Sequence, residues 1–230
     1  MATMSPTQAR EYWKALVDNA AALIADANVL LNAESYGRAR SLTVLAQEEL
    51  GKALWVYDSF HLAWSKGDEV PRTVGMLVQH GRKHTEKYLE AFVFGDELAA
   101  FWGDFDAEFA EFHDAESWEE AHARRRLEAE TASRQANVQK QLGFYVDRDA
   151  DGTIHSPAGI EAGTIPQDLQ TAARVVEMLL IKDHSRMKFD ATTPYDSTHP
   201  QQFRLLPISH PDDWTEASED FKRGPDLPPA

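Results

Sequence analysis

The stretch that decides the fold is residues 35–54, which read SYGRARSLTVLAQEELGKAL. Here and just beyond, residues recur every three or four positions, the spacing at which side chains share one face of a helix. This mostly apolar stripe consists of Leu42, Leu45, Ala46, Glu49, Ala53, Val56 and Phe60. The pattern predicts a helix from about residue 35 to residue 64 that packs one face against a core.

The two adjacent glutamates of this stretch fall on different faces of the predicted helix. Glu48 precedes Lys52 by four residues, and a Glu-to-Lys pair in this order stabilises a helix by about 0.2–0.5 kcal/mol. Glu49 lies within the stripe, where a carboxylate needs an ion-pair or hydrogen-bond partner. We therefore interpret Glu48 and Lys52 as a surface pair and expect Glu49 to point inward.

A partner for Glu49 is available in the predicted third helix, residues 71–94. His84 lies on the apolar face of that helix, and His80 lies one turn earlier. We hypothesise that Glu49 and His84 meet in the bundle interior. Because buried polar groups are normally hydrogen-bonded, the pair is consistent with a structural bond as well as with a functional site.

The rest of the chain predicts a mostly α, antiparallel helical bundle. Ser5-Pro6-Thr7-Gln8 is a capping box with proline at the first helical position. Further helices are predicted over residues 117–142 and 164–187, with a hairpin or loop insertion between them. We assign residues 1–188 to the bundle and 189–230 to an extended, Pro-rich C-terminal tail that wraps or flanks it, with one short helix near residues 214–221.

Charge and composition exclude several classes of protein. The chain has 23 Lys and Arg against 38 Asp and Glu, a net charge of −15, which argues against an extended surface for duplex DNA. It has no cysteine, hence no disulfide or thiolate metal site. No leader-like or membrane-spanning run is visible. We expect a cytoplasmic protein without a membrane partner.

The arrangement resembles the AbiV family of abortive-infection proteins, helical bundles of the HEPN superfamily. Three segments carry the resemblance: residues 35–54, HGRKHTEK at 80–87, and KQLGFYVDRDADGTIHSP at 140–157. It covers roughly residues 10–185 and implies a prokaryotic anti-phage effector that stops translation or cuts RNA. It also implies a homodimer, with RNA or a phage or host protein as partner.

One feature of catalytic HEPN proteins is missing from the predicted helices. Metal-independent HEPN ribonucleases carry an arginine followed by a histidine after four to six residues, and the two handle the phosphate and the 2′-hydroxyl. Here Arg148 and His155 span a predicted turn, and Arg204 and His210 fall in the tail. Whether the chain is an enzyme stays open.

Any site must therefore be built from other residues. The candidate catalytic residues are Glu49, His84 and Arg82, and the candidate binding residues are Glu48, Lys52, Arg38, His80 and Lys87.

A calcium loop is the weaker of two interpretations of residues 147–158. Asp147, Asp149 and Asp151, followed by Gly152, match its opening. The twelfth position, where a bidentate glutamate is needed, is Ala158. A β-hairpin with Asp151-Gly152 in its turn is favoured.

Two other classes of function remain as alternatives. One is a non-catalytic module that binds a protein. The other, less favoured, is a di-iron-like bundle enzyme, for which Glu49, His80, His84, Glu177 and His184 are candidates. None of these candidates has the Glu-x-x-His spacing of such sites, in which the glutamate precedes the histidine by three residues, and we expect no cofactor.

Overall fold

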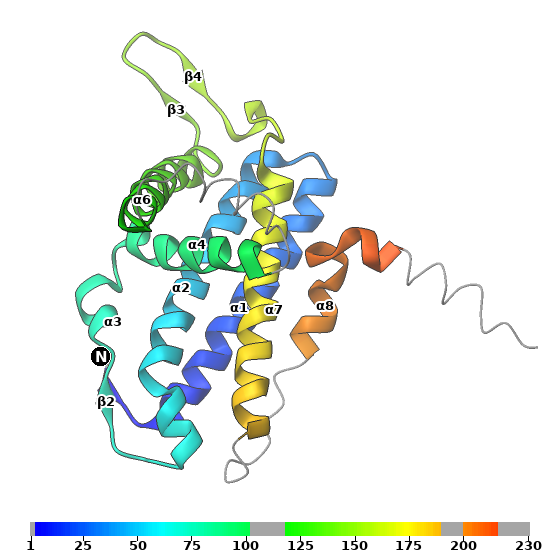
Figure 1. The fold of residues 1–230 in the computed structure, drawn as a ribbon. Coiled ribbons are helices and arrows are strands. Elements are labelled where there is room, and N and C mark those ends of the chain that lie inside the picture. The colour runs from blue at the N-terminus through cyan, green and yellow to red at the C-terminus, as the bar shows by residue number, and fades with distance from the viewer. Residues whose placement is uncertain (1–2, 102–117, 190–199, 216–230) are drawn as a thin grey trace, which may run out of the picture.

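The structure, a computed structural model, describes residues 3–101, 118–189 and 200–215. Its centre is formed by three long helices: α1 (Pro6–Asn32), α2 (Tyr36–Lys66) and α7 (Ile165–Phe189). Helix α1 runs antiparallel to the other two, while α4 (His84–Phe101) and α6 (Trp118–Leu142) cross the α2 axis (Figure 1). The predicted mostly α bundle is confirmed.

Helix α1 begins at the predicted capping box. The Ser5 hydroxyl accepts a hydrogen bond from the Gln8 backbone N–H at 3.2 Å, and the Gln8 side chain accepts one from the Ser5 N–H at 3.0 Å. These two bonds satisfy backbone donors that have no partner within the first turn. The buried face of α1 then packs against α2 through Trp13, Leu16, Val17, Ala20 and Ile24.

Helix α2 is covered on several sides because α1, α7, α4 and α6 all pack against it. Its buried residues therefore extend around most of its circumference, and they include Ala46, Glu48 and Leu50. Leu42 and Leu45 are only partly buried. The predicted helix is confirmed, and Ala46, Ala53, Val56 and Phe60 of its predicted stripe are fully buried. The prediction is wrong only for the partly exposed members of the stripe, among them Glu49.

Two glycines let other segments approach α2 closely. A Cβ atom on Gly51 would lie 1.9 Å from the Lys87 carbonyl oxygen of α4, and one on Gly143 would lie 2.1 Å from the Gly37 carbonyl oxygen. No side chain fits at either distance, so glycine is required at both places. At the second contact, the Ser41 hydroxyl donates to the Lys140 carbonyl at 2.8 Å.

The predicted third helix, residues 71–94, is interrupted. The structure has strand β2 (Arg72–Thr73), the short helix α3 (Gly75–His80) and then α4. Strand β2 pairs antiparallel with β1 (Thr3–Met4). Glycine, a poor helix former, stands at the start of α3 and directly after it. His84 consequently lies at the start of α4, not in mid-helix.

The insertion before α7 is a β-hairpin, as favoured over a calcium loop. Strands β3 (Asp147–Arg148) and β4 (Ile154–His155) pair antiparallel, and Gly152 adopts φ 94° in the turn. The short 3₁₀ helix η1 (Pro157–Gly159) follows. The hairpin extends away from the bundle (Figure 1).

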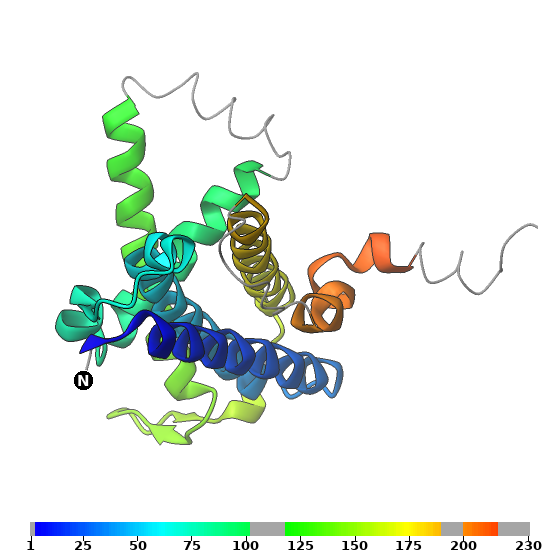
Figure 2. The same cartoon turned by 90° about the horizontal axis from the view of Figure 1, so that it is seen from below.

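The described part of the tail is helical where an extended segment was expected. Helix α8 (Pro200–Ser209) packs on α7 and buries Leu205, and the Gln170 and Arg174 side chains donate to the Ser209 carbonyl. It lies on the outer side of α7, away from α6 (Figure 2). Residues 216–221 of the predicted short helix lie outside the described residues, and the domain boundary at 188/189 stays a prediction.

A buried ion cluster closes one end of the core. Asp183 of α7 is fully buried and binds Arg10 of α1 at 2.7 Å and Arg186 at 3.0 Å. Both guanidinium groups lie over the Trp64 ring, 5.3 and 5.6 Å from its centroid. The cluster joins the first and last helices of the central trio. Among the helices that the structure describes, none is long and apolar enough to cross a membrane.

Candidate functional site

The site is centred on the buried carboxylate of Glu48, whose side chain is 3% exposed. Its Oε1 lies 2.5 Å from Nζ of Lys140, and its Oε2 lies 2.6 Å from Nδ1 of His84 and 3.2 Å from Nζ of Lys87. The two lysine side chains are themselves only 8% and 10% exposed. One carboxylate thus joins three helices.

Each of these side chains is positioned by its place in the chain. Glu48 lies on the face of α2 that Gly51 opens to α4, one turn away. His84 and Lys87 lie three residues apart in the first turn of α4, so they share a face. Lys140 lies in the last turn of α6, where its own carbonyl is held by Ser41.

The electrostatics favour an ionised Glu48. Burial alone raises its pKa, but hydrogen bonds from Lys140 and His84 and the charges of Lys140 and Lys87 act in the opposite direction, and the net effect lowers the pKa below its ordinary value of 4.5. Since two ammonium groups face a single carboxylate, the cluster carries a net positive charge even with a neutral imidazole.

The imidazole of His84 is oriented by this cluster. A carboxylate only accepts hydrogen bonds, so Nδ1 of His84 is the donor to Glu48, and in the neutral ring Nε2 is then the unprotonated nitrogen. The side chain is 53% exposed. The ring therefore combines a fixed tautomer with solvent access, the properties of a general base or acid.

The predicted roles of the two glutamates are reversed in the structure. Glu49 binds Lys52 at 2.7 Å as a partly exposed pair, and Glu48, not Glu49, meets His84. The expected Glu48–Lys52 and Glu49–His84 contacts are both wrong. The reason is the covering of α2 on several sides, which places its partly exposed edge along Leu42, Leu45 and Glu49.

The remaining predicted residues are placed around the cluster or away from it. Of the described residues, those that bind the Glu48 carboxylate include Lys87 but not Arg82, His80 or Arg38. Arg82 is exposed in the turn before α4, and His80 ends α3. Arg38 lies in the first turn of α2, where it donates to Ser35 at 3.4 Å.

Sequence reasoning missed Lys140, which lies 92 residues from Glu48. A signal for it existed. Lys140 opens the segment 140–157 and Glu48 belongs to the segment 35–54, and these are two of the segments that carry the family resemblance. The structure shows that they meet through a buried ion pair.

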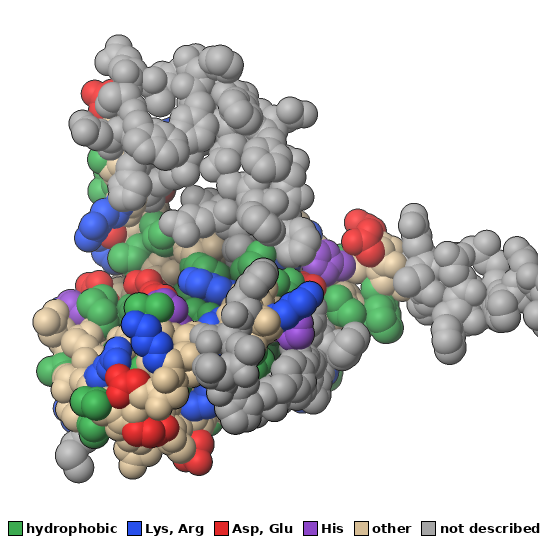
Figure 3. All heavy atoms as spheres, turned by 60° about the horizontal axis from the view of Figure 1, so that its bottom comes forward, with side chains coloured by type: hydrophobic (Ala, Val, Ile, Leu, Met, Phe, Trp, Pro, Cys, Tyr) green, Lys and Arg blue, Asp and Glu red, His purple; other side chains and the backbone are tan. Residues whose placement is uncertain are grey.

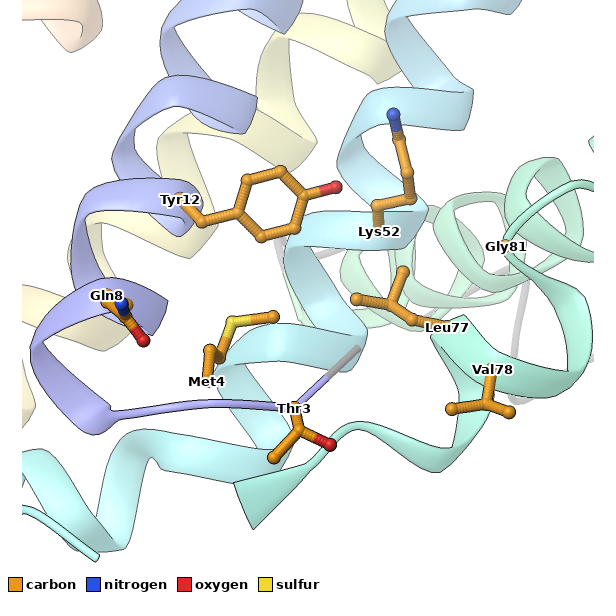
Figure 4. A pocket seen from close by; sticks show the side chains of 8 residues that line it. All are labelled: Thr3, Met4, Gln8, Tyr12, Lys52, Leu77, Val78 and Gly81. Carbon is orange, nitrogen blue, oxygen red and sulfur yellow. The ribbon is translucent and has the colours of Figure 1, made fainter. Parts of the chain in front are cut away.

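A groove lies beside the cluster, between the start of α1, α2 and α3 (Figure 4). It has a volume of about 750 Å³. Its lining comprises Thr3, Met4, Gln8, Tyr12, Lys52, Leu77, Val78 and Gly81. Lys52 follows Glu48 by one turn, and Gly81 precedes His84 by three residues, so the groove adjoins the cluster.

The acidic residues of the hairpin are engaged with their neighbours. Asp147 and Asp151 accept backbone N–H bonds at 2.8 and 2.9 Å, and Asp149 binds His155 at 2.7 Å. The described ranges contain no group of three or more His, Asp or Glu side chains arranged to hold a metal ion. Glu177, a candidate of the di-iron alternative, binds His210 beside α8.

Neither arginine–histidine pair with ribonuclease spacing lies on one helical face. Arg148 and His155 belong to the two strands of the hairpin. Arg204 lies on α8, and His210 follows its end.

Comparison with known proteins identifies the family of the chain. The sequence model HEPN_AbiV, described as AbiV, matches residues 8–177, which include most of α1, all of α2 and α4, the hairpin and half of α7. No curated protein and no solved structure matches the chain. The family match extends over well more than half of the 230 residues, and the chain belongs to the AbiV family of the HEPN superfamily.

Proposed function

We propose that this protein is an anti-phage abortive-infection effector that acts on RNA, with His84 as its acid–base residue. The observation that carries the proposal is the 2.6 Å contact between the buried Glu48 carboxylate and Nδ1 of an exposed histidine. Glu48 is a positioning residue in this scheme, since it acts through the imidazole. Family membership supports the role in abortive infection.

The chemistry requires no metal ion. Nε2 of His84 removes the proton of a ribose 2′-hydroxyl, and the resulting oxygen attacks the adjacent phosphorus. The bond from phosphorus to the 5′-oxygen breaks, the products are a 2′,3′-cyclic phosphate and a 5′-hydroxyl, and the leaving oxygen takes a proton from water or from a protonated histidine. Excess positive charge from Lys87 and Lys140 favours the phosphate at this place.

The test is cleavage of end-labelled tRNA and mRNA by the purified full chain, with and without chelator. We expect chelator-independent cleavage and cyclic-phosphate ends. His84→Ala should reduce the rate by at least about 100-fold, the usual contribution of general acid–base catalysis. Glu49→Gln is the matched control and should retain activity, because Glu49 binds Lys52 and not His84.

The results separate the classes of function. Absence of cleavage by the wild-type chain, or full cleavage by His84→Ala with an unchanged melting temperature, contradicts the ribonuclease proposal. Cleavage abolished by chelator supports a metal-dependent enzyme instead.

A second candidate function is a non-catalytic module that binds a phage or host protein and blocks translation by occupancy. The observation that favours it is the exposed apolar surface of the hairpin, where Tyr145, Val146 and Ile154 are each 68% exposed. In that case cells that express the His84→Ala variant retain protection against phage, while substitution of these three side chains abolishes the protection.

A further inference from the structure

The hairpin carries more exposed apolar surface than its own folding needs. We call residues 144–156 the arm. Phe144 is 41% exposed, and Tyr145, Val146 and Ile154 are each 68% exposed. Four large apolar side chains are thus exposed within one short projecting segment, and such a concentration of exposed apolar surface is typical of a protein interface.

The arm is held firmly at its base. Gly143 packs directly on Gly37 and on the Ser41 hydroxyl, and a Cβ atom on Gly37 would lie 2.6 Å from the carbonyl oxygen of Pro157. Both ends of the arm are thus fixed to the first turn of α2, while the arm itself points away from the bundle (Figure 1). Its orientation is set by the fold.

The groove beside the cluster offers a surface of matching character. Figure 4 shows the side chains of Met4, Tyr12 and Leu77 directed into the space between α1, α2 and α3. Val78 at its edge is 63% exposed, and Tyr12 is 37% exposed. The groove therefore presents aromatic and aliphatic atoms to solvent, as the arm does.

The charges around the two surfaces are opposite. The arm carries Asp147, Asp149 and Asp151 against Arg148. Next to the groove, Arg82 and Lys83 follow Gly81 directly and are exposed. The chain as a whole has a net charge of −15, but Figure 3 shows Lys and Arg side chains interspersed with acidic ones, so charge of either sign is local.

The arm does not reach the groove of its own chain. Its base is fixed at Gly37, and the groove is lined by Lys52 of the same helix. At 1.5 Å per residue these positions are about 22 Å apart along α2, and the arm points away from α3 (Figure 1). An occupant must come from another molecule.

We propose that the arm of one copy docks in the groove of a second copy, and that the contact is reciprocal about a two-fold axis. A two-fold axis perpendicular to α2 sets the two helices antiparallel, which brings Gly37 of one copy level with Lys52 of the other. Apolar arm residues then cover Met4, Leu77 and Val78, and the arm carboxylates face Arg82 and Lys83. The proposal is independent of RNA cleavage.

The first test measures the mass of the full chain by sedimentation over a range of concentrations. We expect a dimer, with Tyr145→Asp in the arm and Val78→Asp in the groove each weakening association by about tenfold or more. The matched control is Val29→Asp, at a valine of α1 that is 67% exposed but lies in neither surface. It should leave the mass unchanged.

A mixing experiment gives the decisive comparison. A chain with Tyr145→Asp keeps its groove and a chain with Val78→Asp keeps its arm, so the mixture regains one intact contact and should dimerise more strongly than either variant alone. If one variant does not fold, Val146→Ser in the arm or Val78→Ser in the groove replaces it, and circular dichroism establishes that each chain is folded.

A covalent test exploits the absence of cysteine from the chain. Tyr145→Cys and Val78→Cys, made in separate chains and mixed under mild oxidation, should give a heterodimeric disulfide in preference to either homodimer. A wild-type chain that stays monomeric, a dimer unaffected by both Asp variants, or random cross-linking would each overturn the proposal.

Discussion

Nζ of Lys140 lies 2.5 Å from Oε1 of Glu48 although 92 residues separate them in the chain. The contact is buried, and the same carboxylate holds His84 and Lys87. A single side chain therefore fixes both α4 and α6 on α2. Removing the Glu48 carboxylate should therefore reduce stability more than removing the carboxylate of the neighbouring Glu49.

Glu48→Gln should destabilise the protein by about 3–5 kcal/mol, because it leaves two buried ammonium groups without their counter-charge. Glu49→Gln makes the same chemical change one residue away, at a partly exposed pair, and should cost less than about 1 kcal/mol. Urea unfolding followed by circular dichroism measures both. Equal losses for the two variants would contradict the central place given to Glu48.

The stability contributed by Glu48 should depend on pH in one direction. Because its pKa in the folded protein is below its ordinary value of 4.5, the contribution is present above that value and is lost as pH falls through the folded-state pKa. Glu48→Gln and its parent are compared in a His84→Ala background, so that no imidazole titrates at this site. Their melting temperatures should differ by a constant amount from pH 7 to about pH 5 and converge below it.

Gly51→Ala should destabilise the protein by about 3 kcal/mol, since the new methyl group meets the Lys87 backbone at 1.9 Å. Backbone atoms cannot swing aside, so α4 must move away from α2 and draw His84 and Lys87 from Glu48. Gly75→Ala is the control, because nothing lies within 4 Å of the added Cβ. It should change stability by less than about 1 kcal/mol. Thermal unfolding of both variants separates the two effects.

Asp183→Asn should cost about 3 kcal/mol or more, since Arg10 and Arg186 are then left buried around a neutral side chain. Asp58→Asn removes a carboxylate that is 57% exposed and 4.0 Å from Lys182, and it should have little effect. Chemical denaturation measures the difference. A small loss of unfolding free energy for Asp183→Asn would contradict the prediction and show that water solvates the two guanidinium groups without the carboxylate.

The helical pattern predicted much of the bundle but misplaced the two glutamates. Capping at Ser5 and the long period of α2 depend on local backbone chemistry, which the sequence contains. Which face of α2 is inward depends on how many neighbours cover it, and that number is not local. Glu49 was assigned to the interior because Leu42 and Leu45 share its stripe, yet all three lie on the partly exposed edge.

Long-range contacts account for the other differences. The break before His84 follows from Gly81 and from the pairing of Thr73 with Thr3, just before the start of α1, which no local pattern in 71–94 reveals. Lys140 was within a recognised segment, but its role depends on the crossing of α6 over α2. His84 stays a predicted site residue, and the glutamate that it contacts is Glu48 and not the predicted Glu49.

The buried charge of Glu48 also bears on how the helices assemble. Helices α1 and α2 are adjacent in the chain and can form a hairpin as soon as residue 66 is made. In that pair of helices, α1 and α2, Glu48 still faces water, because Lys87 and Lys140 belong to helices made later. The hydrated carboxylate opposes burial of this face by any uncharged segment, and only the arrival of α4 and then α6 neutralises it. The charge of Glu48 thus favours native docking of α4 and α6 on α2 over non-native packing of uncharged segments against the same face.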